Sequence, residues 1–377
     1  MKKIIYKKIA LDCARFFLLS ILTFGVIIWV LQAVNYLDFV IEDGHGFFVY
    51  FNYTILSFPK ILSRLFPFAT FLSFTYILLK YENKNELVIF WNFGVKKIDF
   101  IKFFIKFSII FVLFSLLLNS IITPAAQDKA RSFIRSSNLN FFESILKPRQ
   151  FIDIIKNLTI YYDKKTENGD FQNIFLKDNS NTNDSQITFA KIGRLEIRGN
   201  RKVLVLYDGK TINKRDEKIS EFVFSKTDFN MTKLGSRSTT HQKTQETSTM
   251  DLVKCLLIFN NLKEKEKPKL NNINNCRYDN LENIYQVLYS RLIKPLYITF
   301  LITISLLLIL KSKDDHTFRI YKFKIYSFGF LFIIFLETSA NFINTNVFQN
   351  LFLSILPFIF VFIIYIYFIN ELKIKKR

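Results

Sequence analysis

Five charged side chains lie inside or beside apolar segments that are long enough to cross a membrane. They come from three separate segments, and they are Lys60, Arg64, Arg291, Lys294 and Glu337. Charge is costly in hydrocarbon, so ionisable residues within spans tend to pair with one another or to line a path for a polar ligand. Lysine and arginine suit an anionic ligand. The alternative is that these long side chains only extend to the lipid headgroups.

The positions of these charges along their segments place them at a similar depth. If Lys80 marks the inner edge of its span, Lys60 lies 20 residues back at the outer interface, and Arg64 lies one turn inside it. In another segment, Glu337 follows Lys324 by 13 residues, which is about 20 Å of helix. We therefore expect these charges to lie near the outer leaflet, where they could hold a lipid headgroup.

The stretch "NKNELVIFWNFGVKKID" (83–99) connects the second and third of the apolar segments and is longer than a turn requires. Asn83 and Glu86 have the spacing of a capping box, in which each side chain binds the backbone N–H of the other residue. Gly94 is typical of a helix stop. The stretch therefore predicts a short helix over about residues 84–94.

This predicted helix has an acidic tip and an aromatic side. Leu87, Phe90 and Trp91 share one face at helical spacing, and Glu86 lies in the first turn. A helix that lies on the headgroups is expected to carry basic residues on its polar face. An acid beside aromatic residues instead suits docking into a groove of a partner protein. The alternative is an interfacial helix without a partner.

The remaining motifs do not indicate catalysis. The run "VLVLYDGKT" (203–211) ends in Gly-Lys-Thr, but a phosphate loop needs a glycine where Leu204 stands, so we interpret it as a β-turn. The three histidines fall in separate loops, and no Ser or Cys has the context of a nucleophile elbow. We predict no catalytic residue, no metal site and no cofactor, and a membrane-embedded enzyme is the least favoured alternative.

The charged residues must be positioned by membrane helices. The chain has 377 residues, half of them apolar and 45 of them Phe, which exceeds what a soluble protein buries. About 20 apolar residues in a helix span the hydrocarbon layer. Six segments satisfy this, three before a long polar stretch and three after it, namely 16–37, 55–79, 103–122, 292–310, 325–343 and 351–369. The sequence therefore predicts a polytopic membrane protein.

The distribution of charge predicts the orientation of the chain. The net charge of +21 could suggest nucleic acid, but the joint over-use of Lys, Asn, Ile, Phe and Tyr indicates compositional drift instead. Lysines and arginines cluster at both termini and after the second and fourth spans, whereas residues 38–53 and 344–350 contain none. By the positive-inside rule both termini face the cytoplasm and residues 124–290 face the other side. We predict a bacterial inner-membrane location and no nucleic-acid partner.

The long polar segment predicts a β domain. After an amphipathic stretch over 127–142 come short runs of alternating polarity at 158–163, 171–177, 186–191, 193–199, 202–209 and 219–231. Such spacing indicates an antiparallel sandwich or roll. We expect residues 233–249 to be a loose connector and 250–262 to be a helix. Cys255 and Cys276 could form a disulfide or remain unpaired, and the sequence leaves both alternatives open.

Several stretches resemble the lipopolysaccharide-export permeases of the LptF/LptG (YjgP/YjgQ) family, most of all LptF. The longest is "NELVIFWNFGVKKIDFIKFFIKFSIIFVLFSLLLNSIITPAAQ" (85–127). The others are "GVIIWVLQAVNYLDFVIEDG" (25–44), "FPKILSRLFPFATFL" (58–72), "YSRLIKPLY" (289–297) and "ILPFIF" (355–360). Their order and spacing cover nearly the whole chain.

The resemblance implies a fold and a set of partners. The fold is an α-helical polytopic membrane protein with three plus three spans and an inserted periplasmic β-jellyroll-like domain, divided as 1–123, 124–290 and 291–377. The implied partners are a cytoplasmic ABC ATPase dimer, an LptF/LptG-type partner permease, an LptC-type bitopic protein and lipopolysaccharide. Glu86 takes the role of the acid that meets the ATPase. Asn35 stands where the family often has a basic residue, so our hypothesis is that Lys60 or Arg64 substitutes for it.

The function implied is that of a permease subunit without catalytic activity of its own. It would extract a glycolipid from the outer leaflet of the inner membrane and pass it to a periplasmic jellyroll, with ATP hydrolysed by a separate subunit. The alternative is a mechanotransmission or scaffold protein of the ABC type, which moves a periplasmic domain without carrying lipid.

Overall fold

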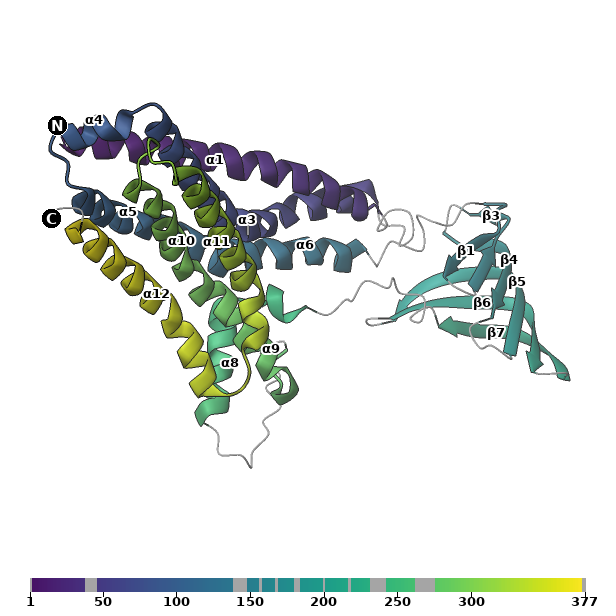
Figure 1. Ribbon diagram of the computed structural model, residues 1–377. Coiled ribbons are helices and arrows are strands. Elements are labelled where there is room, and N and C mark those ends of the chain that lie inside the picture. The colour runs from purple at the N-terminus through teal and green to yellow at the C-terminus, as the bar shows by residue number, and fades with distance from the viewer. Residues whose placement is uncertain are drawn as a thin grey trace. The chain divides into compact units, whose positions relative to one another are not determined.

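The computed structural model describes residues 2–37, 46–137, 148–155, 158–166, 169–179, 184–198, 201–215, 218–230, 242–261 and 275–374. Contacts within the chain divide it into two compact units (Figure 1). The helical unit comprises Met1–Val34, Thr54–Ala130 and His241–Arg377, and the β unit comprises Asn35–Tyr53 and Arg131–Thr240. Each unit is described separately below.

The helices before the β strands are long and nearly continuous. They are α1 (Lys2–Asn35), α3 (Phe47–Asn83), the short α4 (Glu86–Asn92), α5 (Lys97–Leu117), the π-helical η1 (Leu118–Ile122) and α6 (Thr123–Ser137). Two prolines lie inside α3, Pro59 and Pro67. Proline lacks the N–H that would bond four residues back, so each one leaves a backbone carbonyl of α3 without its helical partner.

The helices after the strands are broken into shorter pieces. They are η3 (Thr244–Glu246), α8 (Thr249–Asn261), η4 (Tyr278–Asn280), α9 (Leu281–Leu288), the π-helical η5 (Tyr289–Ile293), η6 (Lys294–Leu296), α10 (Tyr297–Leu306), η7 (Leu307–Leu310), α11 (Phe318–Thr338), η8 (Ser339–Phe342) and α12 (Val347–Ile374). The pieces from η4 to η7 follow one another without a gap, and we call them together span four.

The described residues contain six helices long and apolar enough to cross a membrane. They are Ile4–Asn35, Phe47–Asn83, Lys97–Ile134, Tyr278–Leu310, Phe318–Phe342 and Phe348–Leu372. Each predicted segment overlaps one of them, so the predicted three-plus-three arrangement is confirmed. Span four is the most buried of the six. Its α10 packs against α5, α11 and α12, which places it at the centre of these helices (Figure 1).

Aromatic rings fill the interior of the helical unit. Phe66, Phe71, Phe74 and Phe104 are fully buried. The ring of Phe74 meets that of Phe104 edge to face at 5.9 Å between centroids. Such pairs contribute about 1 kcal/mol beyond the apolar area that they bury. The many phenylalanines of the sequence therefore serve packing between spans.

Gly329 allows α11 to approach α3 closely. A Cβ atom at this position would overlap the ring of Phe71, which is fully buried and has no free space to move into. We expect Gly329→Leu to destabilise the protein by about 3 kcal/mol through overpacking, seen as a lower midpoint of thermal unfolding in detergent. Gly46→Leu is the control, because nothing lies within 4 Å of a Cβ there. Equal midpoints for the two variants would contradict the close approach.

The described strands of the β unit form one antiparallel sheet. Its strands are β1 (Ile152–Ile155), β2 (Leu158–Tyr161), β3 (Lys164–Lys165), β4 (Phe171–Asp178), β5 (Asp184–Arg198), β6 (Arg201–Arg215) and β7 (Lys218–Asn230). The order across the sheet is β1-β2-β4-β5-β6-β7, with β3 paired to β4. The predicted antiparallel β domain is confirmed. Most described strands pair with their neighbours in sequence, as in a meander, but β2 pairs with β4 rather than with β3. The predicted runs 186–191 and 193–199 form a single strand, β5.

The Gly-Lys-Thr sequence lies inside β6, so its interpretation as a β-turn is wrong. Gly209, Lys210 and Thr211 pair with β5 on one side and β7 on the other. The Asp-Gly pair at 208–209 is typical of turns. In the structure Asp208 has a left-handed φ of 48°, which interrupts the strand locally without ending it. A side chain at Gly209 would collide with the carbonyl of Phe189, so the glycine is required by the sheet itself.

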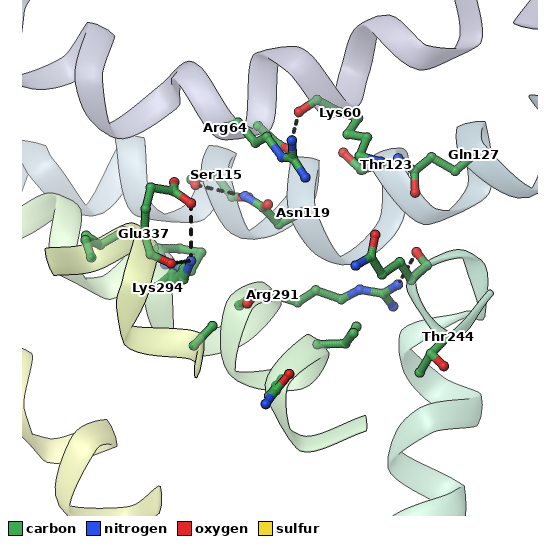
Figure 2. A pocket seen from close by; sticks show the side chains of 18 of the residues that line it. Lys60, Arg64, Ser115, Asn119, Thr123, Gln127, Thr244, Arg291, Lys294 and Glu337 are labelled. Carbon is green, nitrogen blue, oxygen red and sulfur yellow. Dashed lines mark hydrogen bonds and ion pairs between the residues drawn. The ribbon is translucent and has the colours of Figure 1, made fainter. Parts of the chain in front are cut away.

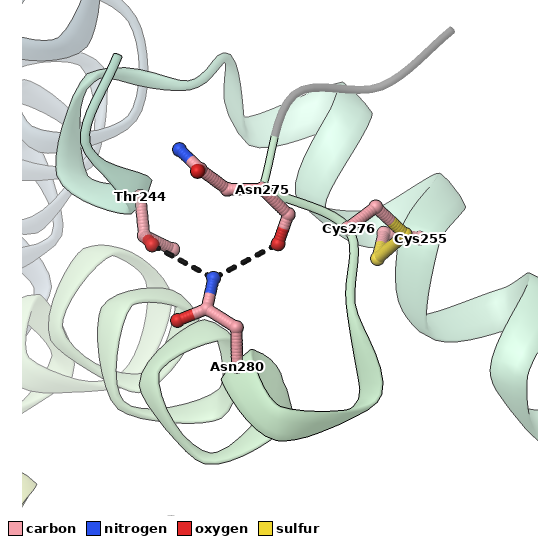
Figure 3. The surroundings of a disulfide bond; sticks show 5 residues. All are labelled: Thr244, Cys255, Asn275, Cys276 and Asn280. Atoms are coloured by element: carbon pink, nitrogen blue, oxygen red, sulfur yellow. Dashed lines mark hydrogen bonds between the residues drawn. A yellow bond between two sulfur atoms is a disulfide. The ribbon is translucent and has the colours of Figure 1, made fainter. Parts of the chain in front are cut away.

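A disulfide between Cys255 and Cys276 resolves the alternatives that the sequence left open (Figure 3). It joins α8, whose predicted existence is confirmed, to the residues just before η4. Next to it, the side-chain amide of Asn280 donates to the Asn275 carbonyl and to Thr244 Oγ1, each at 2.9 Å. The described end of the predicted connector, residues 242–249, is therefore ordered rather than loose, while residues 233–241 lie outside the described part.

Candidate functional site

A cavity of about 600 Å³ lies within the helical unit. Its lining comes from α3, α5, η1, α6, span four, α11 and the segment around η3 (Figure 2). All five charged residues singled out in the spans contribute to it, namely Lys60, Arg64, Arg291, Lys294 and Glu337. The structure therefore brings together residues that are far apart in sequence. The sequence predicted a similar depth for them, but not that they would line one cavity.

The local structure of α3 directs two of these charges into the cavity. Lys60 and Arg64 are four residues apart, so they lie on one face of the helix. Pro67 lies on the same wall and cannot bond to the carbonyl of Ser63, which also lines the cavity. The Ser63 carbonyl is thus left without its helical donor near Lys60 and Arg64, so α3 offers this part of the cavity a hydrogen-bond acceptor as well as two cations.

Glu337 pairs with Lys294 at one side of the cavity (Figure 2). The Lys294 ammonium lies 3.4 Å from Glu337 Oε2 and donates to the Glu337 backbone carbonyl at 3.1 Å. Arg64 is exposed, and it is close enough to Lys294 for their like charges to repel. Glu337 is therefore the one carboxylate of a described lining that contains several cations.

Arg291 is used differently from the other cations. It is buried, and its guanidinium donates to the carbonyls of Gln245 and Thr247 and to Thr249 Oγ1, each at 2.9 Å. Thr249 Oγ1 in turn donates to the Ser120 carbonyl in η1 at 2.6 Å. Arg291 thus fastens the segment before α8 to spans three and four, and backbone dipoles compensate much of its charge.

The structure also shows which residues the sequence analysis missed or misplaced. Asn119 and Lys243 line the cavity, but the sequence analysis singled out neither. Asn119 could have been found as an amide within an apolar segment, whereas Lys243 sits in a stretch interpreted as loose. Asn35 is exposed at the end of α1 and is not among the lining residues.

The cavity has a strongly positive lining. Five cationic side chains and one carboxylate line it within the described residues, namely Lys60, Arg64, Lys243, Arg291, Lys294 and Glu337. Opposite charges attract strongly where water is partly excluded, because the effective dielectric constant is low. The cavity is therefore suited to a ligand with more than one negative charge.

The predicted docking helix exists as α4, but its start differs from the prediction. Asn83 belongs to α3, and the residue before α4 is Asn85, which has a left-handed φ of 60° and no side-chain cap. The predicted capping box is therefore wrong, because the chain turns sharply through Asn85 instead. The predicted stop at Gly94 is confirmed by its φ of +75° and its bond to the Trp91 carbonyl at 3.0 Å.

The aromatic face of α4 packs against the chain itself. Leu87 is only 1% exposed, Phe90 is buried, and Trp91 meets the ring of Phe100 at 5.6 Å. These side chains thus anchor α4, which is a different role from the partner contact that the sequence analysis assigned to them. The apolar residues that α4 and its C-cap leave exposed are Val88, Ile89 at 47% and Phe93 at 58%.

The flanks of α4 are bonded to the end of span four and to the residues just after it. Before α4, buried Glu82 accepts a bond from the backbone N–H of Lys313 at 2.8 Å. After α4, the Lys97 ammonium donates to the Ile309 carbonyl at 2.9 Å. Glu86 itself lies 3.9 Å from Lys8 of α1. A displacement of α4 would therefore pull on span four, which carries two of the cavity's cations.

The β unit has a groove of its own. It encloses about 1060 Å³ and is lined mainly by apolar and aromatic side chains, including Phe151, Phe175, Phe189, Val223 and Phe224. Rings on an exposed sheet face are unusual for a soluble surface and commonly mark a binding site. This groove is suited to hydrocarbon.

These features define a class of protein. Three membrane spans, an inserted antiparallel β unit and three further spans make up a multi-pass membrane protein, with a cationic cavity in its helical unit and an apolar groove in its β unit. The sequence model described as "Lipopolysaccharide export system permease LptF/LptG" matches residues 9–371. The chain belongs to this family, whose members are permease components of lipopolysaccharide export rather than enzymes.

A curated relative extends the comparison. Over 194 residues the chain is 28% identical to "Uncharacterized protein RP871" of Rickettsia prowazekii (strain Madrid E). The match covers 51% of this chain and 54% of the relative, so the chain spans about half the length of the curated relative that it matches.

Proposed function

We propose that this protein is a permease subunit that extracts a lipopolysaccharide-type glycolipid from the outer leaflet of the inner membrane and passes it to the β unit. The observation that carries the proposal is the cationic cavity, to which α3, span four and α11 each contribute charge. A glycolipid with phosphorylated sugars supplies the several negative charges that this lining requires. Lys60, Arg64 and Lys294 are the proposed headgroup contacts, with Arg291 and Glu337 holding the wall.

The apolar groove of the β unit supports the next step. Moving acyl chains through water would cost about 0.8 kcal/mol per CH₂, which sums to tens of kcal/mol for several chains. A continuous apolar route avoids this cost. The aromatic groove on the β unit offers such an environment outside the membrane.

Two independent features support an orientation with cytoplasmic termini and a periplasmic 124–290 segment. The first is the distribution of lysine and arginine over the connecting segments. The second is the disulfide between Cys255 and Cys276, because such bonds form in the periplasm and are rare in the cytosol. In this orientation α4 is cytoplasmic.

We assign to α4 the contact with a separate ATPase dimer. Glu86 is partly exposed at its first turn, and Ile89 and Phe93 offer apolar contacts to a groove. The bonds from its flanks to Ile309 and Lys313 would transmit a movement of α4, caused by the ATPase, to span four and so to the cavity. A second permease of the LptF/LptG type and an LptC-type protein would complete the assembly.

Site-specific photocrosslinking in cells tests the proposal. A crosslinking amino acid at Asn119 samples the cavity, one at Phe175 samples the β groove, and one at Leu113 on the exposed face of α5 is the control. We expect adducts with lipopolysaccharide at the first two positions and none at the third. Absence of adducts from both, with an ATPase still bound, would favour a mechanotransmission protein that carries no lipid.

A further inference from the structure

A second hollow in the helical unit is separate from the cationic cavity. It is a groove of about 610 Å³ between α5, α10 and α12. Apolar side chains form its floor, among them Ile105, Ile109, Val361 and Phe362. It shares no lining residue with the cationic cavity.

Two lysines lie at one end of this groove. Lys102 and Lys106 are four residues apart on α5, so they share a face, and both are exposed. They lie roughly 8 and 14 Å along the helix from its first residue, Lys97. Asn119, which lines the cationic cavity, is 13 residues beyond Lys106, or about 20 Å. The two lysines therefore lie at a different level of the membrane from Asn119, although the other end of the groove, at Leu296, follows Pro295 of the cavity lining directly.

Among the residues that the structure describes, the two lysines have no negative partner. The lining of the groove contains no carboxylate, and in the described residues neither Lys102 nor Lys106 forms an ion pair. The facing elements contribute only Leu296 from η6, Thr299 from α10 and, from α12, apolar residues with Tyr365. A positive charge at this depth is costly unless an anion compensates it.

We propose that this groove binds an anionic phospholipid of the cytoplasmic leaflet. The phosphate lies on Lys102 and Lys106, and an acyl chain lies along α12. Basic pockets between membrane helices on the cytoplasmic side commonly hold such headgroups. Only the choice of leaflet rests on the orientation proposed above; the complementarity of the groove to a negatively charged lipid does not.

The length of the apolar floor distinguishes a lipid from a soluble anion. A free phosphate would need only the two lysines, and it would leave the apolar surface of α5, α10 and α12 uncovered. A phospholipid covers both features, because its phosphate can bind the lysines while its acyl chain covers the apolar floor. Pro357, which lines the groove inside α12, removes a backbone hydrogen bond there and shapes the helix at this wall.

Native mass spectrometry of the full-length protein tests the proposal. The protein is released from nanodiscs of phosphatidylcholine doped with phosphatidylglycerol, and the lipids that remain bound are counted. We expect wild type to retain phosphatidylglycerol selectively, and Lys102→Gln/Lys106→Gln to lose about 30-fold of that selectivity. Val361→Trp keeps the charges but fills the groove, and it should also lose the lipid.

The matched control is Lys80→Gln/Lys84→Gln. It removes the same charge from two exposed lysines that do not line the groove, so it should retain the lipid as wild type does. Equal retention of both lipids by wild type would overturn the proposal, as would undiminished binding in the groove variants. A photocrosslinking amino acid at Ile109 in the groove gives a further check. Adducts with a membrane protein instead of lipid at this position would also overturn the proposal. These outcomes are independent of lipopolysaccharide adducts at Asn119, so the two proposals can fail separately.

Discussion

Lys294→Glu is expected to abolish lipopolysaccharide export while leaving the chain in the membrane. The substitution places a second carboxylate beside Glu337 and removes the cation that now lies 3.4 Å from it. Two adjacent carboxylates would repel an anionic headgroup as well as each other. The Glu337 side chain is 52% exposed, so loss of the ion pair alone costs only about 1 kcal/mol. Most of the expected effect therefore comes from repulsion of the anionic headgroup. The yield of lipopolysaccharide crosslinked at Asn119 measures the effect.

A charge swap separates binding from folding in this experiment. Lys294→Glu combined with Glu337→Lys restores the ion pair and the net charge of the cavity, so export should largely return. Glu337→Gln removes the only carboxylate of the described lining and should keep the headgroup bound. Export at the wild-type level by Lys294→Glu, with the protein present in normal amount, would remove Lys294 from the proposed site.

Ile89→Asp is expected to release the ATPase without unfolding the permease. Ile89 is exposed on α4, and the proposed partner groove would have to bury the new charge without a counter-ion. A substitution at the centre of an interface commonly costs 2 kcal/mol or more, which is about 30-fold in affinity. Co-purification of the ATPase with the permease is the measurement. Glu86→Lys should act in the same direction.

Leu87→Asp provides the contrast that tests which face of α4 meets the partner. Leu87 is buried against the helical unit, so its replacement should lower the thermal midpoint of the permease alone. Ile89→Asp should leave that midpoint unchanged. If Ile89→Asp keeps the ATPase bound and Leu87→Asp releases it from a stable permease, the aromatic face is the docking face after all.

The elements of this fold were predictable because their signals are periodic and local. Six apolar segments, alternating strands and a glycine stop at Gly94 are each read within a short window of sequence. The similar depth of Arg64, Lys294 and Glu337 was predictable too, since a fixed rise per residue converts sequence position into depth. Depth is one coordinate only, so it predicts a shared level for these three side chains but not which faces of their helices meet.

Contacts that depend on neighbours in three dimensions could not be predicted. Periodicity shows that Leu87 and Phe90 share a face, but it does not show whether the chain or a partner covers that face. The fastening of Gln245 and Thr247 by Arg291 uses backbone carbonyls, which every residue has, so no side-chain pattern marks it. The β-turn predicted at residues 208–211 was wrong for a related reason. A single left-handed residue, here Asp208, can interrupt a strand without ending it, and the sequence does not distinguish the two cases.

The disulfide has a consequence for the covalent integrity of the molecule. Spans one to three precede Cys255, and spans four to six follow Cys276. A single peptide bond cut between these two cysteines would therefore leave both halves of the transporter attached through sulfur, and only a reductant would separate them. Between Cys255 and Cys276 the two halves are joined both by the peptide chain and by the disulfide. A protease that cuts this segment therefore cannot by itself separate the first three spans from the last three.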